Sequence, residues 1–147
     1  MTLSLSSSSF PDGGDIPQKY GKKSDNVSPQ LSWTGVPEDA RSFAIAMVDT
    51  HPVARGYVHW LVADIDPATT SLPEGAADGG MPTGSSELTP YAGPFPPSGT
   101  HDYEFTLYAL DAESLALPAG VTLDEFTARI KDRSLATART VGRFTKQ

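Results

Sequence analysis

The sequence predicts a single mainly β domain, built as a sandwich or barrel, with a helical segment near its C-terminal end. A length of 147 residues suits one hydrophobic core, so residues 1–147 are interpreted as one domain. The 13 glycines and 13 prolines interrupt the chain often, which disfavours long helices. Between residues 28 and 111, short apolar stretches are separated by these Gly and Pro positions, a pattern typical of consecutive strands.

The expected strands are Gln30–Thr34, Ser42–Asp49, Tyr57–Asp64 and Tyr103–Leu110. Successive side chains of a strand point to opposite faces, so each stretch predicts which residues lie together. The expected faces are Phe43, Ile45 and Met47, followed by Asp49 at the strand end; Tyr57, His59, Leu61 and Ala63; and His101, Tyr103, Phe105 and Leu107, if the last strand includes His101. Asp102 and Glu104 would then face solvent.

Helical patterns occur only near the C-terminal end. Thr122 precedes Leu123 and is followed three residues later by Glu125, which predicts a capping box at the start of a helix. Phe126 and Ile130 would lie on one side of that helix. A second short helix is expected from Ser134 to about Val141, where Leu135, Ala138 and Val141 recur at helical spacing.

Composition excludes several classes of function. The formal net charge of −7 disfavours nucleic acid and anionic membranes as partners. The longest apolar run, Phe43 to Val48, is far too short to span a bilayer, and the opening MTLSLSSSSF lacks the pattern of a secretory signal, so we expect a cytoplasmic protein. With 0 cysteines the chain has no disulfide, thiolate nucleophile or Cys-based metal site.

The sequence contains no nucleophile elbow, phosphate-cradling loop or zinc-binding helix motif, so no cofactor or metal is expected. The stretch Tyr91–Tyr103 is the most distinctive, because its prolines make a stiff loop that leads directly into a His-x-Tyr strand. An imidazole and a phenol on one strand face can donate hydrogen bonds to an anion. His101 and Tyr103 are therefore the first candidate ligand-binding residues; the structural alternative is a polar pair hydrogen-bonded within the strand.

His59 and Asp49 are further candidates with structural alternatives. His59 could pack against Leu61 and bond a backbone carbonyl, whereas Asp49 could cap a turn or orient His59. Asp49 and His51 together offer too few ligands for a metal site, so His51 is interpreted as a loop histidine.

Four ordered motifs resemble the phosphatidylethanolamine-binding proteins, above all the bacterial and archaeal branch called Raf-kinase-inhibitor-like. The motifs are Ser28–Pro37, the loop after Asp49, His59-Trp60 and Gly93–Tyr103. The resemblance extends from Ser9–Gly14 to Val141–Phe144 and thus covers nearly the whole chain. It implies a large antiparallel sheet packed on a smaller one, with short helices near the C-terminus.

The resemblance also implies a small surface pocket for phosphate, phosphorylethanolamine or similar anions. The positions that match the family's pocket are Asp49, Tyr57, His59, Gly93, Pro97, His101 and Tyr103. The chain departs from the family pattern in the loop from Asp49 to Val53, at Asp102 in place of an arginine, and at Phe95 in place of a glycine, where a ring could narrow the mouth.

These observations predict a non-enzymatic protein whose pocket binds a small anion. The alternative is a hydrolase of phospho- or carboxyl esters in which Asp49 and His59 or His101 act as acid and base. A third reading, suggested by the family name, is an inhibitor that regulates a kinase or protease. A homodimer is plausible because two-fold dimers are the commonest soluble oligomers.

Overall fold

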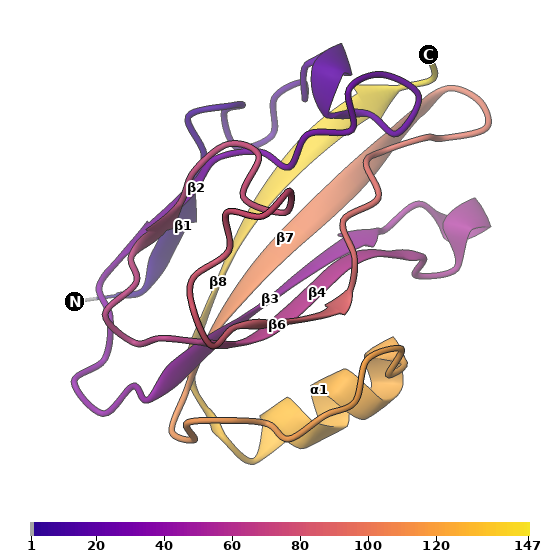
Figure 1. Ribbon diagram of the computed structural model, residues 1–147. Helices are drawn as coiled ribbons and strands as arrows, with labels where there is room; N and C mark the ends of the chain where they lie inside the picture. Colours follow the sequence, from indigo (N-terminus) through magenta and orange to yellow (C-terminus); the bar gives the residue numbers. More distant parts are fainter. Residues whose placement is uncertain (1) are drawn as a thin grey trace.

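The computed structural model describes residues 2–147 as two antiparallel sheets and one α-helix (Figure 1). The smaller, three-stranded sheet has the order β1 (Ser4–Ser6), β2 (Leu31–Thr34), β5 (Ser71–Leu72). The larger, five-stranded sheet has the order β6 (Ser86–Thr89), β4 (Val58–Ile65), β3 (Ser42–Asp49), β7 (Thr100–Leu110), β8 (Ser134–Thr145). The predicted class, a large antiparallel sheet packed on a smaller one, is confirmed.

The main hydrophobic core lies between the two sheets. Phe43, Ile45 and Met47 of β3 are fully buried there, as the alternation along the strand predicted. The smaller sheet contributes Trp33, whose ring meets that of Phe43 edge-on at a centroid distance of 5.4 Å. His101, Tyr103, Phe105 and Leu107 of β7 are likewise all buried, whereas Asp102 is exposed.

The expected common face of Tyr57, His59, Leu61 and Ala63 is wrong, because β4 contains a β-bulge. Met47 pairs with Trp60 and Val48 with Val58, which leaves His59 as an extra residue between the two pairs. Leu61 and Ala63 consequently pack on the outer face of the large sheet, while the His59 ring packs against Tyr103 at a centroid distance of 5.0 Å. The inserted residue thus reverses the alternation at the start of β4.

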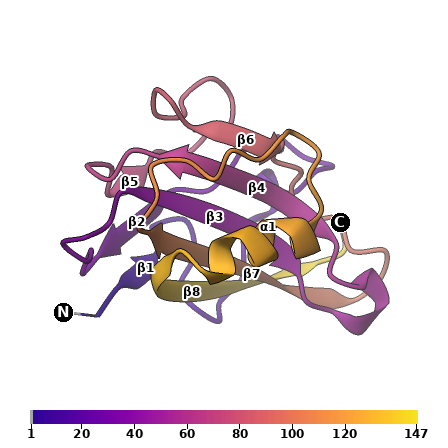
Figure 2. The same ribbon diagram turned by 90° about the horizontal axis from the view of Figure 1, so that it is seen from below.

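The outer face of the large sheet is covered by α1 (Leu123–Lys131), which lies across it in Figure 2. The predicted capping box is present: the Glu125 backbone N–H donates to Thr122 Oγ1 at 3.1 Å, and the Thr122 N–H donates to Glu125 Oε1 at 3.1 Å. Phe126 and Ile130 are buried against the sheet. Two short 3₁₀ helices, η1 (Gln18–Tyr20) and η2 (Pro52–Ala54), lie in loops.

The second C-terminal helix was predicted wrongly, because residues 134–145 form the edge strand β8. This strand pairs with the whole length of β7, from Thr100↔Thr145 to Leu110↔Ser134. Its buried side alternates with period two, through Ala138, Thr140, Gly142 and Phe144. Leu135 and Val141, which suggested a helical stripe, are not buried, so the pairing partner decided the structure of this segment.

Candidate functional site

The candidate site lies where three neighbouring strands of the large sheet meet at one end. Asp49 is the last residue of β3 and pairs with Tyr103 near the start of β7, while His59 comes from the bulge in β4. Antiparallel pairing places the end of β3 beside the starts of its two neighbours. The topology therefore gathers residues that are more than forty positions apart in the chain, as the Asp49–His101 separation of 52 shows.

These residues surround a cavity of about 270 Å³. The predicted residues on its wall are Asp49, Tyr57, His59, Pro97, His101 and Tyr103, and the structure adds Val53, Ala54 and Phe95. Larger hollows lie elsewhere, one of about 440 Å³ beside Asp25 and Asp78 and one of about 630 Å³ beside Arg41 and Glu113. They contain none of the three histidines, whereas His59 and His101 line the smaller cavity.

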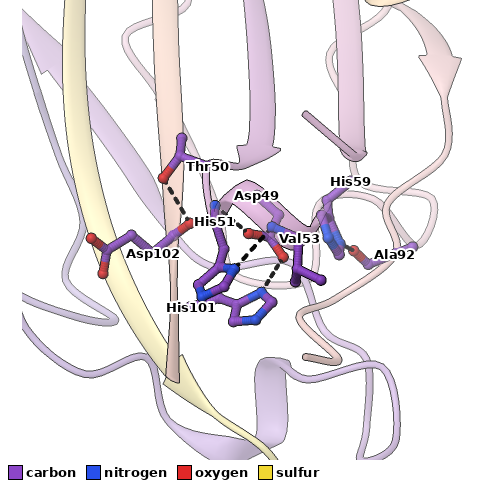
Figure 3. A network of polar contacts seen from close by, with 8 residues as sticks. All are labelled: Asp49, Thr50, His51, Val53, His59, Ala92, His101 and Asp102. Atoms are coloured by element: carbon purple, nitrogen blue, oxygen red, sulfur yellow. Dashed lines mark hydrogen bonds and ion pairs between the residues drawn. The ribbon is translucent and has the colours of Figure 1, made fainter. Parts of the chain in front are cut away.

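Asp49 and His101 form a buried pair at the base of the cavity (Figure 3). His101 Nδ1 lies 2.7 Å from Asp49 Oδ2, and the two side chains are only 2% and 5% exposed. The second carboxylate oxygen accepts the backbone N–H of His51 at 2.9 Å. Asp49 thus orients His101 rather than His59 and also caps its own turn. With Nδ1 donating to the carboxylate, His101 keeps Nε2 for other partners.

His59 is held by the backbone instead of by a carboxylate. Its Nδ1 donates to the carbonyl of Ala92 at 2.6 Å, and the residue is 2% exposed. Burial lowers the pKa of His59 below its ordinary value, and the Ala92 carbonyl and the Asp49 charge offset that effect only in part. The ring is therefore neutral at pH 7, with its proton on Nδ1 and a lone pair on Nε2.

Tyr103 contributes a buried phenol to the wall of the cavity. Its side chain is fully buried, yet the hydroxyl has no hydrogen-bond partner among residues 2–147. Burial, reinforced by the nearby Asp49 charge, raises the pKa of Tyr103 well above its ordinary value. The hydroxyl therefore keeps its proton throughout the physiological pH range. A buried polar group without a partner is unusual enough to call for an explanation.

His51 was not foreseen as part of this arrangement. Its ring stacks on His101 with a centroid distance of 3.9 Å and an interplanar angle of 8°. Its Nδ1 accepts the N–H of Val53 at 3.1 Å, which caps η2. The only signal in the sequence was the spacing of His51 two residues after Asp49. His51 is a loop histidine, as expected, but one that packs against the Asp49–His101 pair.

The mouth of the cavity is aromatic and apolar. The rings of Tyr57 and Phe95 meet edge-on at 5.7 Å, and Phe95 lies 5.5 Å from the His59 ring. Lys22 places its Nζ 4.6 Å from the centre of the Phe95 ring. Phe95 lines the cavity together with Tyr57 and Val53, so its ring forms part of the apolar wall.

Gly93, a predicted site residue, is buried. It is not among the described residues that line the cavity. A Cβ at this position would lie 2.1 Å from the backbone oxygen of Tyr20, so only glycine fits. The Gly93 N–H donates to Asn26 Oδ1 at 2.7 Å, and Pro94 accepts the Lys22 N–H at 3.1 Å. Gly93 therefore positions the proline-rich loop rather than facing the cavity.

Within the described chain, no group of three or more His, Asp or Glu side chains is arranged to hold a metal ion. No described helix is long and apolar enough to cross a membrane. The cytoplasmic location stays a prediction.

Comparison with known proteins identifies the family. The sequence profile of the phosphatidylethanolamine-binding protein family matches residues 6–145. A UPF0098 protein of Methanothermobacter thermautotrophicus is 36% identical, covering 97% of this chain and 98% of that protein. A Mycobacterium tuberculosis protein whose name proposes a lipoprotein, LppC, is 38% identical over 97% of this chain and 72% of its own length.

Structural comparison agrees with the sequence match. The crystal structure of Escherichia coli YbcL, described as a member of the mammalian PEBP family, superposes with a TM-score of 0.90 at 26% sequence identity, over 100% of both chains. The two-sheet architecture and the match over residues 6–145 lead to the same conclusion: this chain belongs to the phosphatidylethanolamine-binding protein family.

Proposed function

We propose that the cavity binds a small anion, of the phosphate, phosphorylethanolamine or carboxylate type, and that the protein works as a binding module rather than as an enzyme. The observation that carries this proposal is the Tyr103 hydroxyl, which is fully buried on the cavity wall without a partner. A buried hydroxyl left unpaired costs about 1–3 kcal/mol, and an anion oxygen in the cavity would recover that cost.

The histidines supply the other contacts. His101 and His59 both use Nδ1 on the protein, at 2.7 Å to Asp49 and 2.6 Å to Ala92, which leaves each Nε2 for a ligand. When an imidazole takes up a proton, its Nε2 becomes a donor, and hydrogen bonds between charged partners are roughly twice as strong as neutral ones. The Asp49 carboxylate would balance the charge of a protonated His101.

Anion binding is therefore expected to be coupled to protonation. Burial lowers the pKa of His59, so this ring is neutral in the empty cavity at pH 7. A bound anion favours the charged form and raises that pKa. Binding should accordingly strengthen as the pH falls from 8 to 6, with Asp49 supporting the imidazolium and the Lys22 charge opposing it, as both do in the free protein.

Calorimetric titration with inorganic phosphate and with acetate, at pH 6 and pH 8, tests the proposal. Removing the hydroxyl with Tyr103→Phe should weaken binding of either anion at least tenfold, because a hydrogen bond to a charged group contributes about 1.5–3 kcal/mol. Tyr108→Phe is the matched control, since Tyr108 lies on the same strand but does not line the cavity. Absence of binding of both anions, or equal binding by the Tyr103→Phe variant, would refute the proposal.

The Asp49–His101 pair supports one alternative, a hydrolase that activates water by general-base catalysis. A buried carboxylate holding an imidazole by Nδ1 is the arrangement such a base requires. Turnover of p-nitrophenyl acetate or p-nitrophenyl phosphate, abolished by His101→Ala, would favour this alternative over a binding module. Regulation of a kinase or protease is a further proposal, which pull-down from the native host would test.

A further inference from the structure

The volume and lining of the cavity restrict the class of ligand further than the requirement for an anion does. Its volume is about 270 Å³, whereas a cavity of about 150 Å³ is enough to hold benzene. A carboxylate or phosphate group replaces only a few waters of about 30 Å³ each. The cavity therefore has room for an anionic group together with a second group the size of a small ring.

The lining divides into a polar floor and an apolar mouth. The floor consists of Asp49, His59, His101 and Tyr103, and the mouth of Val53, Ala54, Tyr57, Phe95 and Pro97. Val53 is 62% exposed and Tyr57 48% exposed, and these two are the most exposed large apolar side chains of the described residues. Large apolar side chains gathered at the rim of a cavity mark a surface that a ligand covers.

The charges of the floor suit a ligand with a single negative charge. Asp49 accepts from His101 Nδ1 and from the His51 N–H, and a carboxylate has no proton to donate, so it adds a negative charge but no donor. Three donors remain, namely the Tyr103 hydroxyl and, once protonated, the Nε2 atoms of His59 and His101. Because the buried Asp49 carboxylate repels each negative charge placed in the cavity, a monoanion such as a carboxylate is favoured over a dianion.

We propose that the ligand is a monocarboxylate bearing a compact aromatic or branched substituent, with the carboxylate at Tyr103 and His101 and the substituent packed against the rings of Tyr57 and Phe95. This inference rests on the proposed anion site and narrows its ligand class. The edge-on rings of Tyr57 and Phe95, 5.7 Å apart, form the apolar wall that a planar or branched group would contact.

Calorimetric titration at pH 6 with acetate, benzoate, benzamide and phosphate separates the contributions. Each buried methylene strengthens binding by about fourfold, so benzoate should bind at least tenfold more tightly than acetate. Benzoate should also bind more tightly than the uncharged benzamide and than phosphate. Phe95→Ala should remove most of the preference for benzoate over acetate. Phe95→Leu, which keeps an apolar side chain, should retain part of it.

Leu135→Ala is the matched control, because Leu135 is an exposed apolar residue, at 40%, that does not line the cavity. Thermal unfolding of each variant establishes that it is folded. Equal affinity for acetate and benzoate, tighter binding of phosphate or benzamide, or an unchanged preference in Phe95→Ala would overturn this inference while leaving the anion site intact. If acetate, benzoate and phosphate all fail to bind, the proposed function itself is wrong.

Discussion

Replacing Asp49 by Asn should change the proton position on His101 as well as the stability of the protein. Both partners of Asp49 are donors: the His51 backbone N–H at 2.9 Å and His101 Nδ1 at 2.7 Å. An amide offers one acceptor and one donor end, so Asn can accept from only one of them. The amide oxygen should keep the His51 N–H, and its NH₂ group should donate to Nδ1. His101 would then carry its proton on Nε2.

The energetic cost follows from the bonds that change. A hydrogen bond to a charged group contributes about 1.5–3 kcal/mol and a neutral one about 0.5–1.5 kcal/mol, so weakening two bonds should cost about 2 kcal/mol. For a chain of this length that is a fall of about 4–8 °C in Tm. Asp49→Ala, which leaves both donors unpaired, should cost about 3–5 kcal/mol, as expected for breaking a buried pair.

Urea unfolding gives the two free energies, and long-range ¹H–¹⁵N correlation spectra report the tautomer of His101. We expect stability to fall in the order wild type, Asp49→Asn, Asp49→Ala, with the His101 proton on Nδ1 in the wild type and on Nε2 in the Asn variant. An Asn variant as stable as the wild type, or one with the His101 proton still on Nδ1, would refute the reasoning about this pair.

Three further predictions concern stability. Burial lowers the folded-state pKa of His59 below the ordinary 6.5, so the unfolded chain binds the proton first as the pH drops. The free energy of unfolding should therefore fall as pH drops through 6.5. In His59→Asn, urea unfolding should show a free energy that depends less on pH. Gly93→Ala should cost about 1–3 kcal/mol, because its Cβ would meet the Tyr20 oxygen at 2.1 Å. Gly56→Ala is the control: its Cβ would meet open space, so it reports only the strain of a left-handed backbone, at φ +73°, and should lose less. Thr122→Ala should cost about 1 kcal/mol in thermal unfolding, while Thr122→Ser should retain most of the cap.

The elements whose structure depends on nearby residues in the sequence were predicted correctly. The alternation along Ser42–Asp49 identified a buried strand correctly, and the Thr122 capping box located the start of α1. The strand β8 was missed because its side chains fit a helical spacing as well, and only its long pairing with β7 decides the structure. An edge strand with one buried side carries a weak signal of its own.

The site shows the same division. The resemblance placed Asp49, His59, His101 and Tyr103 together, and the structure brings all of them onto one cavity. Which histidine Asp49 orients could not be predicted, because that depends on the bulge that turns His59 toward the Ala92 carbonyl. The period-two alternation of a strand does not indicate where a bulge inserts an extra residue. The stacking of His51 on His101 joins residues that are 50 positions apart. Its only sign in the sequence was that His51 follows Asp49 by two residues.

The pairing of β8 with β7 makes formation of the cavity depend on synthesis of residues 134–145. Tyr103 lies opposite Gly142, and its ring meets Phe144 at 6.5 Å, so one flank of the residue is supplied by β8. A ribosomal product that stopped before Ser134 would have β3 beside β7 on one side and a bare row of amides and carbonyls on the other. Such fragments should aggregate by strand addition instead of retaining a partly formed cavity.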